Sequence, residues 1–254
     1  MDNRRTGRNI YLELIELLGQ NKPCILCTVT DTIGSTPQKP GSSAVFDETG
    51  LVLGTVGGGA VEHIVQIKAA AAVHDKKSGI FHFDLDNEIS EEEAAICGGG
   101  MSILLDASPE QHRPVFSKMR EDIGNQKPGI LLSLVTETKT SGATIRRMWI
   151  TSEDQKEELY GLKGTTAAIV KEMLFKPVSG DFRKIDVKET ESAEKQVIFL
   201  ETILPLPRLL IAGAGHVGKA VSQFASLLDF EVIVWDERKD YANHDNLPLS
   251  LIHI

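Results

Sequence analysis

The hexapeptide Gly213-Ala214-Gly215-His216-Val217-Gly218 constrains the fold of this chain more than any other feature. It follows an apolar run at 209–212 and opens a helical pattern, and Asp236 stands 18 residues after Gly218, behind a second apolar run. In a Rossmann unit the first glycine permits a tight turn, the second lets a pyrophosphate approach the backbone, and the third lets the helix pack on the strand. We therefore predict a Rossmann-like βαβ unit over residues 205–254.

The residues around this turn are candidates for nucleotide binding. The helix N-terminus offers free N–H groups to an anion, and Asp236 would accept a hydrogen bond from a ribose 2′-hydroxyl, which favours an unphosphorylated ribose such as that of NAD. His216 is interpreted either as a phosphate neighbour or as a hydrogen-bonding residue at the helix start. A Rossmann-shaped unit without a ligand is the alternative. The candidates are Gly213, Gly215, His216, Gly218 and Asp236.

Two prolines in Leu204-Pro205-Leu206-Pro207 separate this unit from the chain before it. We predict an N-terminal mixed α/β domain over 1–204, with a subdomain joint near 125–129, so that the whole protein is of the α/β class. Periodicity and turn residues predict its elements. Helices are expected at 10–18, 60–77, 90–97, 114–123 and 165–175, and strands at 24–32, 43–47, 51–56, 80–85, 101–107, 129–135, 144–150 and 195–201.

Composition excludes several classes of protein. The chain has 254 residues, a formal charge of −9, 41% hydrophobic residues and three cysteines. Net acidity argues against nucleic acid or an anionic membrane as the main partner, and the start of the chain lacks a secretory signal pattern. We therefore expect a cytoplasmic protein that does not enter a membrane. Cys24 and Cys27 stand at positions that face opposite sides of one strand, so we interpret both as core residues.

The second glycine signal is Gly57-Gly58-Gly59, which stands between a predicted strand and a predicted helix with Glu62 in its first turn. Three glycines cost backbone entropy, which favours close approach of a ligand or a nest of N–H groups around an anion. Glu62 could complement the helix dipole, as first-turn acids usually do, or take part in metal binding or proton transfer.

The third signal is Cys97, which stands beside Gly98-Gly99-Gly100. A thiol next to flexible backbone is accessible to a ligand, but the predicted helix C-terminus at this point raises a thiol pKa. A reactive cysteine and a buried structural cysteine both remain open on these grounds.

These motifs together resemble the XdhC/CoxI family, the accessory proteins of xanthine dehydrogenase and related molybdenum hydroxylases. The resemblance covers the chain from about Ile10 to Arg238. It rests on the ordered motifs Gly34-Ser35-Thr36-Pro37 with Gly41, Gly54-Thr55-Val56-Gly57-Gly58-Gly59 with Val61-Glu62, Cys97-Gly98-Gly99, and the stretch from Pro205 to Gly218.

The resemblance implies a protein that binds molybdenum cofactor, holds it while a cysteine desulfurase supplies sulfur, and passes it to an apo-hydroxylase. Cys97 matches the cofactor-associated cysteine of the family and would lie at the metal end of the cofactor. The implied cofactor-binding positions are Ser35, Thr36, Lys39, Gly57, Gly58, Gly59, Glu62, Gly98 and Gly99, together with the Rossmann residues.

Two departures from the family pattern matter. Gln38 and Lys39 stand where the family commonly carries an arginine, and a lysine supplies charge without the bidentate fork. Only 18 residues follow Asp236, and the closing LPLSLIHI does not continue the expected Rossmann pattern. We expect a truncated or frame-shifted form of a longer chain, or a natural short form whose strand edges a second copy covers as a homodimer.

The leading hypothesis is a maturation factor for molybdenum cofactor that is not itself an enzyme. An NAD-dependent oxidoreductase that uses the Gly213–Gly218 turn and Asp236 is the alternative, and an interaction scaffold with vestigial glycine loops is the third. Titration with nicotinamide nucleotide and with molybdenum cofactor distinguishes the three.

Overall fold

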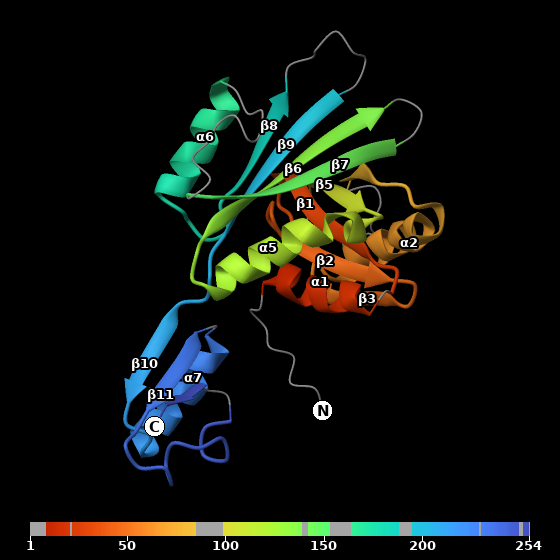
Figure 1. Cartoon of the computed structure of the whole chain (residues 1–254). Helices are drawn as coiled ribbons and strands as arrows, with labels where there is room; N and C mark the ends of the chain where they lie inside the picture. The colour runs from red at the N-terminus through yellow and green to blue at the C-terminus, as the bar shows by residue number, and fades with distance from the viewer. Residues whose placement is uncertain are drawn as a thin grey trace. The chain divides into compact units, whose positions relative to one another are not determined.

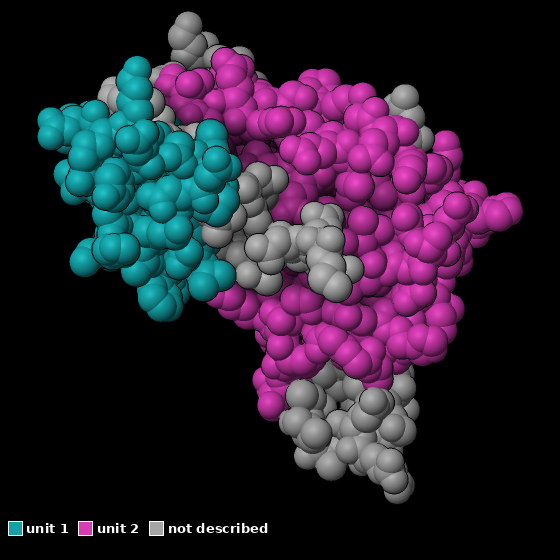
Figure 2. Space-filling view, turned by 90° about the horizontal axis from the view of Figure 1, so that it is seen from below, with its two compact units in different colours: residues 1–9, 205–254 teal, residues 10–204 magenta. Residues whose placement is uncertain are grey.

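A computed structural model describes residues 9–20, 22–84, 99–138, 142–152, 164–187, 195–228, 230–248 and 251–253. The chain forms two compact units, coloured separately in Figure 2: residues 10–204, and residues 205–254 together with residues 1–9. Of the helices that the structure describes, none has both the length and the apolar character needed to cross a bilayer.

The first sheet of the 10–204 unit is antiparallel, with strand order β3-β2-β1-β5-β4 (Figure 1). Its strands are β1 (Ile25–Gly34), β2 (Ser43–Asp47), β3 (Gly50–Gly54), β4 (Gly79–Asp84) and β5 (Gly99–Asp106). Helix α2 (Gly59–Asp75) covers one face, where Val61, Val65 and Ala69 pack on alternate residues of β1 and β5. The apolar positions of this helix recur every three or four residues, so they form one stripe that faces the sheet.

The second sheet is also antiparallel, with strand order β7-β6-β9-β8. Its strands are β6 (Gly129–Thr138), β7 (Gly142–Thr151), β8 (Phe182–Val187) and β9 (Lys195–Ile203). Helix α6 (Gly164–Phe175) packs on one face through Val170 and Met173.

The two sheets face each other across a shared core in the same unit. Leu104 of β5 packs with Val135, Val197 and Phe199 of the second sheet. Helices α1 (Ile10–Gly19) and α5 (Arg113–Gly124), the latter preceded by a 3₁₀ turn (Pro109–His112), fill the rest of this layer. Both sheets therefore have a helix on one face and the other sheet or these helices on the other.

A buried polar group lies in this layer. Arg147 donates two hydrogen bonds to Asp106 Oδ2, at 3.3 and 3.1 Å, and one to Ser133 Oγ at 3.1 Å. Tyr11 donates to Glu201 Oε2 at 2.5 Å. Burial raises the pKa of Glu201 to about 7, against the lowering effects of Tyr11 and Arg147.

The 205–254 unit holds a parallel sheet of strand order β10-β11-β12 with helix α7. Its elements are β10 (Arg208–Ala212), α7 (His216–Leu227), β11 (Glu231–Trp235) and β12 (Leu251–His253). Ala225 of α7 packs on Val232 and Val234 of β11. The Rossmann-like unit expected from the sequence is confirmed, as is the mixed α/β character of the chain.

One sequence-based prediction is corrected and one strand was missed. The closing residues do continue the Rossmann pattern, because Leu251–His253 pairs in parallel with β11. Strand β8 was not predicted, because it is only six residues long and two adjacent charged residues, Arg183 and Lys184, interrupt its apolar pattern. Cys24 and Cys27 are confirmed as buried residues in two different core clusters.

Candidate functional site

The glycine turn before α2 forms an open cradle. Gly57, Gly58 and Gly59 have φ angles of 146°, 70° and 49°, which favour glycine at each position. Within the described part of the chain, a Cβ added to Gly58 or Gly59 would meet nothing within 4 Å, and no side chain caps the helix. The N-terminus of this 17-residue helix carries a partial positive charge, and the space in front of it fits an anion such as a phosphate.

Glu62 holds this turn in place. Its Oε1 accepts hydrogen bonds from Thr55 Oγ1 at 2.5 Å and from the Val56 N–H at 3.3 Å. Thr55 Oγ1 in turn accepts from the Gly57 N–H at 3.2 Å. In this structure the carboxylate therefore positions the glycine turn, and Thr55 is a linking residue that the sequence pattern did not single out.

Three segments that are far apart in the sequence meet at this end of the first sheet. Gly34, at the end of β1, pairs with Gly99, at the start of β5. A Cβ on Gly99 would overlap the Ile33 carbonyl oxygen and lie 3.1 Å from that of Ser35. A Cβ on Gly57 would lie 2.8 Å from Pro37 Cγ. Glycine at 57 and 99 thus allows the loop after β1 to contact both other segments.

Cys97 and Gly98 lie outside the described residues, so the structure does not test their predicted roles. Within the described ranges, no three His, Cys, Asp or Glu side chains converge to hold a metal ion.

Hydrogen bonds within the loop after β1 hold its conformation. Thr36 Oγ1 donates to the Gln38 carbonyl at 3.0 Å, and Ser42 donates to Gln38 Oε1 at 2.9 Å. Lys39 is exposed, and its Nζ lies 3.5 Å from the position of a Cβ on Gly180, just before β8. The structure therefore places the Lys39 ammonium beside Gly180.

A row of polar side chains near the same end of the sheet was also missed. Asp31 of β1 pairs in register with Ser102 of β5, which pairs with His82 of β4. His82 Nδ1 lies 2.8 Å from Ser102 Oγ, and Lys184 Nζ of β8 lies 2.8 Å from Asp31 Oδ2. The hydrogen bond from Lys184 lowers the pKa of Asp31. The only sequence signal for this row was an acidic residue at the end of an apolar strand.

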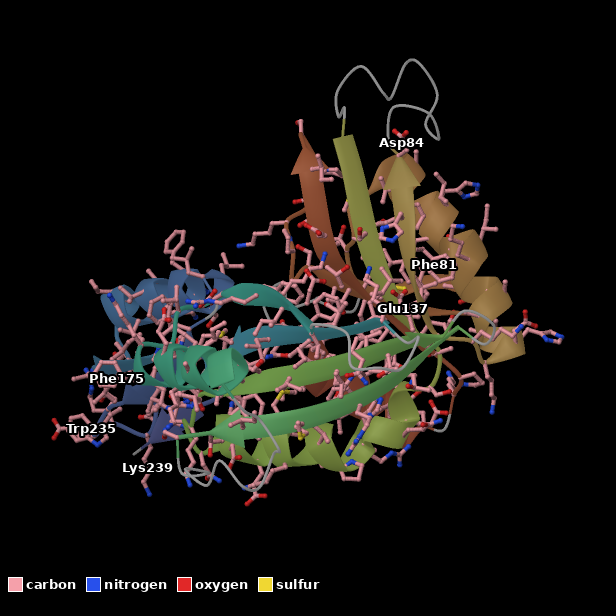
Figure 3. The ribbon with its side chains drawn as sticks, turned by 90° about the horizontal axis from the view of Figure 1, so that it is seen from above. Phe81, Asp84, Glu137, Phe175, Trp235 and Lys239 are labelled. Carbon is pink, nitrogen blue, oxygen red and sulfur yellow. The ribbon has the colours of Figure 1, made fainter. Side chains whose placement is uncertain are left out.

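Strand β4 ends at Asp84, which is labelled in Figure 3 and pairs with Gly100 of β5. The end of β4, the start of β5 and the end of β1 therefore share one edge of the unit. The polar row and the glycine segments both belong to it.

The second glycine turn lies in the 205–254 unit and has the expected Rossmann geometry. Gly213 has φ 109° and its N–H donates to the Trp235 carbonyl at 2.7 Å. A Cβ on Gly218 would overlap the Gly213 carbonyl oxygen, so the third glycine allows the helix to approach the turn. A Cβ on Gly213 or Gly215 would meet nothing within 4 Å among the described residues. His216, the first residue of α7, is exposed.

Asp236 is already fully engaged in this structure. Its carboxylate accepts from the Ala214 N–H at 2.8 Å, the Arg238 N–H at 2.9 Å, and the Arg238 guanidinium at 2.9 and 2.8 Å. These bonds, those from the Arg238 side chain first, hold the pKa of Asp236 well below its usual range. A ribose hydroxyl would have to displace one of these donors, since a carboxylate offers about four acceptor positions. Trp235 and Lys239, on either side of this loop, are labelled in Figure 3.

Two family models match the chain over the two glycine turns. One describes the XdhC and CoxI family and matches residues 17–84, and the other describes the XdhC Rossmann domain and matches residues 209–251.

Two curated proteins are also similar to the chain. The Escherichia coli protein YqeB is 32% identical over 97 residues, which are 38% of this chain and 18% of YqeB. A Bacillus subtilis protein whose name describes a probable component of xanthine dehydrogenase is 23% identical over 243 residues, 94% of this chain and 67% of that protein.

Among solved structures, a crystal structure described as a xanthine dehydrogenase from Bacillus halodurans has a TM-score of 0.69 at 23% identity. It covers 94% of this chain and 66% of its own. The matched region thus spans 18% of YqeB, and the chain spans about two thirds of the two Bacillus proteins. At this identity the structural likeness shows the fold alone.

Proposed function

The chain belongs to the XdhC and CoxI family, and on that premise we propose that it is an accessory factor of a xanthine dehydrogenase-type molybdenum hydroxylase. In this role it binds molybdenum cofactor, presents it for sulfuration and delivers it to the apo-hydroxylase. The names of its Bacillus relatives, which refer to xanthine dehydrogenase, support this role.

The observation that carries the proposal is the meeting of the Gly57–Gly59 turn, the Gly34–Pro37 loop and Gly99 at one end of the first sheet. These are the segments in which the family motifs lie. Cys97 stands two residues before Gly99 in the sequence, so a cofactor held here has a cysteine in the adjoining segment.

The cradle in front of α2 suits the phosphate of the cofactor. Backbone N–H groups at a helix N-terminus and in a nest of positive-φ residues bind phosphate, and a Cβ at Gly58 would intrude into that space. Glu62 and Thr55 hold the turn in the open shape. When bound, the cofactor supplies a molybdenum–sulfur centre, for which a thiolate such as that of Cys97 is a suitable soft ligand.

Two partners follow from this role: a cysteine desulfurase that supplies the sulfur, and the apo-hydroxylase that receives the cofactor. A homodimer is part of the same proposal, because the strands at the sheet edges offer unpaired N–H and C=O groups. Light scattering at micromolar concentration measures the assembly state directly.

An anaerobic titration with sulfurated and desulfo molybdenum cofactor tests the proposal. We expect Cys97→Ala to reduce both cofactor binding and activation of the apo-hydroxylase, with Cys24→Ala as the control that removes a thiol elsewhere. Unchanged binding and reconstitution with Cys97→Ala would remove Cys97 from the mechanism.

A matched pair of glycine variants tests the cradle. Gly58→Ala and Gly50→Ala both place a Cβ at a positive φ, 70° and 130°, but Gly50 lies at the turn between β2 and β3 and only Gly58 stands in the cradle. We expect about a tenfold loss of cofactor affinity for Gly58→Ala and little change for Gly50→Ala. Equal affinities for the two variants would refute the cradle.

A second candidate function is nucleotide binding by the 205–254 unit, favoured by the open turn at Gly213 and Gly215. An NAD-dependent oxidoreductase would require it. Titration with NAD, followed through the fluorescence of Trp235, tests this function. Absence of binding at millimolar NAD would exclude the oxidoreductase.

A further inference from the structure

A cavity of about 450 Å³ lies in the 10–204 unit, and neither the family motifs nor the proposed function uses it. Its volume falls within the roughly 300–1,000 Å³ typical of small-molecule sites. It is formed where the ends of α1 and α2, the start of β1 and the 3₁₀ turn meet. The lining residues are Leu18, Lys22, Pro23, Cys24, Val73, Lys76, Ala107, Glu110 and Arg113.

This cavity lies at the opposite end of the first sheet from the glycine turn. Cys24 stands just before β1, whereas Gly34 ends that strand, and ten residues of strand span roughly 33 Å. Likewise Gly59 begins α2 and Lys76 follows its end, about 25 Å away. A ligand in this cavity is therefore separate from one held at Gly57–Gly59.

The charges that line the cavity are predominantly positive. Among the lining residues, Lys22, Lys76 and Arg113 carry three cations against the single carboxylate of Glu110. The charges of Asp47 and Asp106, which do not line the cavity, also act on Cys24 in its wall, and the C-terminal ends of α1 and α2 each contribute about half a negative charge, so the three cations are partly offset.

The cations differ in how they are held. Arg113 donates to the Leu18 carbonyl at the end of α1, which fixes its guanidinium at the wall. Within the described ranges, neither Lys22 nor Lys76 forms an ion pair. The charge of Lys22 acts on the Asp47 carboxylate, so a bound anion would share Lys22 with Asp47, whereas Lys76 is exposed beside the cavity.

The remaining wall is apolar. Leu18 and Ala107 are buried, Val73 is half-buried, and Cys24 is 6% exposed. Burial, then the charge of Glu110, raises the pKa of the Cys24 thiol to about 11, so the thiol is neutral at physiological pH and acts as part of the apolar wall. A ligand that fits both parts has an anionic group and an apolar body.

We propose that this cavity is a binding site for a small organic anion, whose phosphate or carboxylate lies between Lys22 and Lys76 and whose apolar part packs on Leu18, Val73 and Ala107. The proposal does not depend on the function proposed for the glycine turn. Glu110 disfavours ligands of higher negative charge, because it places a carboxylate at the same wall.

Calorimetric titration with four probes tests the site on the full chain: phenyl phosphate, benzoate, benzyl alcohol and inorganic phosphate. We expect saturable binding of phenyl phosphate or benzoate with a dissociation constant near 1 mM or below. Benzyl alcohol lacks the charge and inorganic phosphate lacks the apolar part, so both should bind at least about fivefold more weakly. The ratio of phenyl phosphate to benzoate affinity distinguishes a phosphate ester from a carboxylic acid as the ligand.

Lysine variants locate the site. Lys22→Gln and Lys76→Asn remove one cation each, and asparagine tolerates the left-handed backbone at position 76. Each should weaken binding by about three- to tenfold, whereas Lys77→Gln, the exposed neighbour that does not line the cavity, should leave it unchanged. Glu110→Gln should strengthen it.

Three results would overturn the proposal: no saturable binding of either aromatic anion up to about 20 mM, equal affinity for benzyl alcohol, or an equal loss in Lys77→Gln. Circular dichroism of each variant checks that the fold is retained, and these exposed lysines make no buried contact whose loss would unfold the unit.

Discussion

The two units of this protein each place a glycine turn between a strand and a helix, yet they hold that turn in different ways. In the 10–204 unit three successive glycines have positive φ, the first of them lies against Pro37, and Glu62 of the following helix fixes the turn. In the 205–254 unit a single positive-φ glycine suffices, and Asp236, just after the next strand, fixes the turn through the Ala214 N–H. The Gly57–Gly59 turn therefore depends on contact with the loop after β1, whereas the Gly213–Gly218 turn depends on residues of its own βαβ unit.

The surroundings of the two units differ as well. Both sheets of the 10–204 unit are covered on both faces. In the 205–254 unit Leu210 of β10 is 67% exposed and Phe224 of α7 is 69% exposed. Two carboxylates, one in each unit, differ in another way, because burial raises the pKa of Glu201, whereas hydrogen bonds, chiefly from Arg238, lower the pKa of Asp236, which is itself buried. The two units therefore have opposite pH dependence.

The largest expected effect comes from Gly218→Ala in the 205–254 unit. Its Cβ would overlap the Gly213 carbonyl oxygen, which is backbone and cannot move aside, so we expect a loss of at least about 3 kcal/mol in unfolding free energy. Gly215→Ala is the control, because that residue is in an extended conformation with open space around it. Denaturant unfolding followed by Trp235 fluorescence measures both, and a similar midpoint for the two variants would contradict the close approach.

The next effect is the pH dependence of the 10–204 unit. The pKa of Glu201 is about 7 in the folded protein, above its ordinary value of 4.5, so the folded state holds a proton that the unfolded state has released. This contribution is fully present below about pH 4.5 and is lost as pH rises through 7, by on the order of 3 kcal/mol. We expect Glu201→Gln, which stays neutral, to flatten the slope.

Fluorescence of the buried Trp149 in a Trp235→Phe background follows this unit alone, because these are the two tryptophans of the chain. A parent protein whose stability is constant between pH 5 and 8 would show that Glu201 is ionised throughout that range.

A smaller effect distinguishes steric contact with Pro37 from backbone strain in the Gly57–Gly59 turn. Gly57→Ala adds a Cβ that lies 2.8 Å from Pro37 Cγ at φ 146°, and should cost about 2 kcal/mol. Gly58→Ala adds only backbone strain at φ 70° and should cost about 1 kcal/mol. Thermal unfolding compares them, and a cost for Gly58→Ala equal to that for Gly57→Ala would mean that Pro37 does not press on the turn.

The last effect is a pH dependence that appears only in acid and belongs to Asp236. Its pKa is lowered in the folded state, chiefly by Arg238, so its contribution to stability is present above about pH 4 and is lost as pH falls further, the opposite sign to Glu201. We expect Asp236→Asn to remove the acid sensitivity of the Trp235 transition. Asp240→Asn, an exposed neighbour, is the control, and loss of the same sensitivity in that variant would assign it to general charge repulsion.

Much of the fold could be predicted from the sequence, because strands such as β2 and helices such as α5 carry strong periodic patterns. Strand β8 and strand β12 could not. Strand β8 is short, and its adjacent Arg183 and Lys184 break the apolar alternation that identifies a strand. Strand β12 is only three residues long and depends on β11 for its pairing.

The candidate site was predictable in the same partial way. The glycine residues stood out because no plain connection needs them. The role of Thr55 depends on the folded turn, which brings it to Glu62 and Gly57, and the Asp31–Ser102–His82 row is formed only by pairing across strands.

The sequence by itself determined most of the turns, strands and helices, because local backbone preferences and apolar periodicity operate over a few residues. Only the tertiary structure decided that Gly34, Gly57 and Gly99 share one end of a sheet, and that the ends of α1 and α2 enclose a cationic cavity at the other. Those neighbours are set by strand order and by the packing of two sheets. The free energy of burying apolar faces, which no single segment carries, fixes that arrangement.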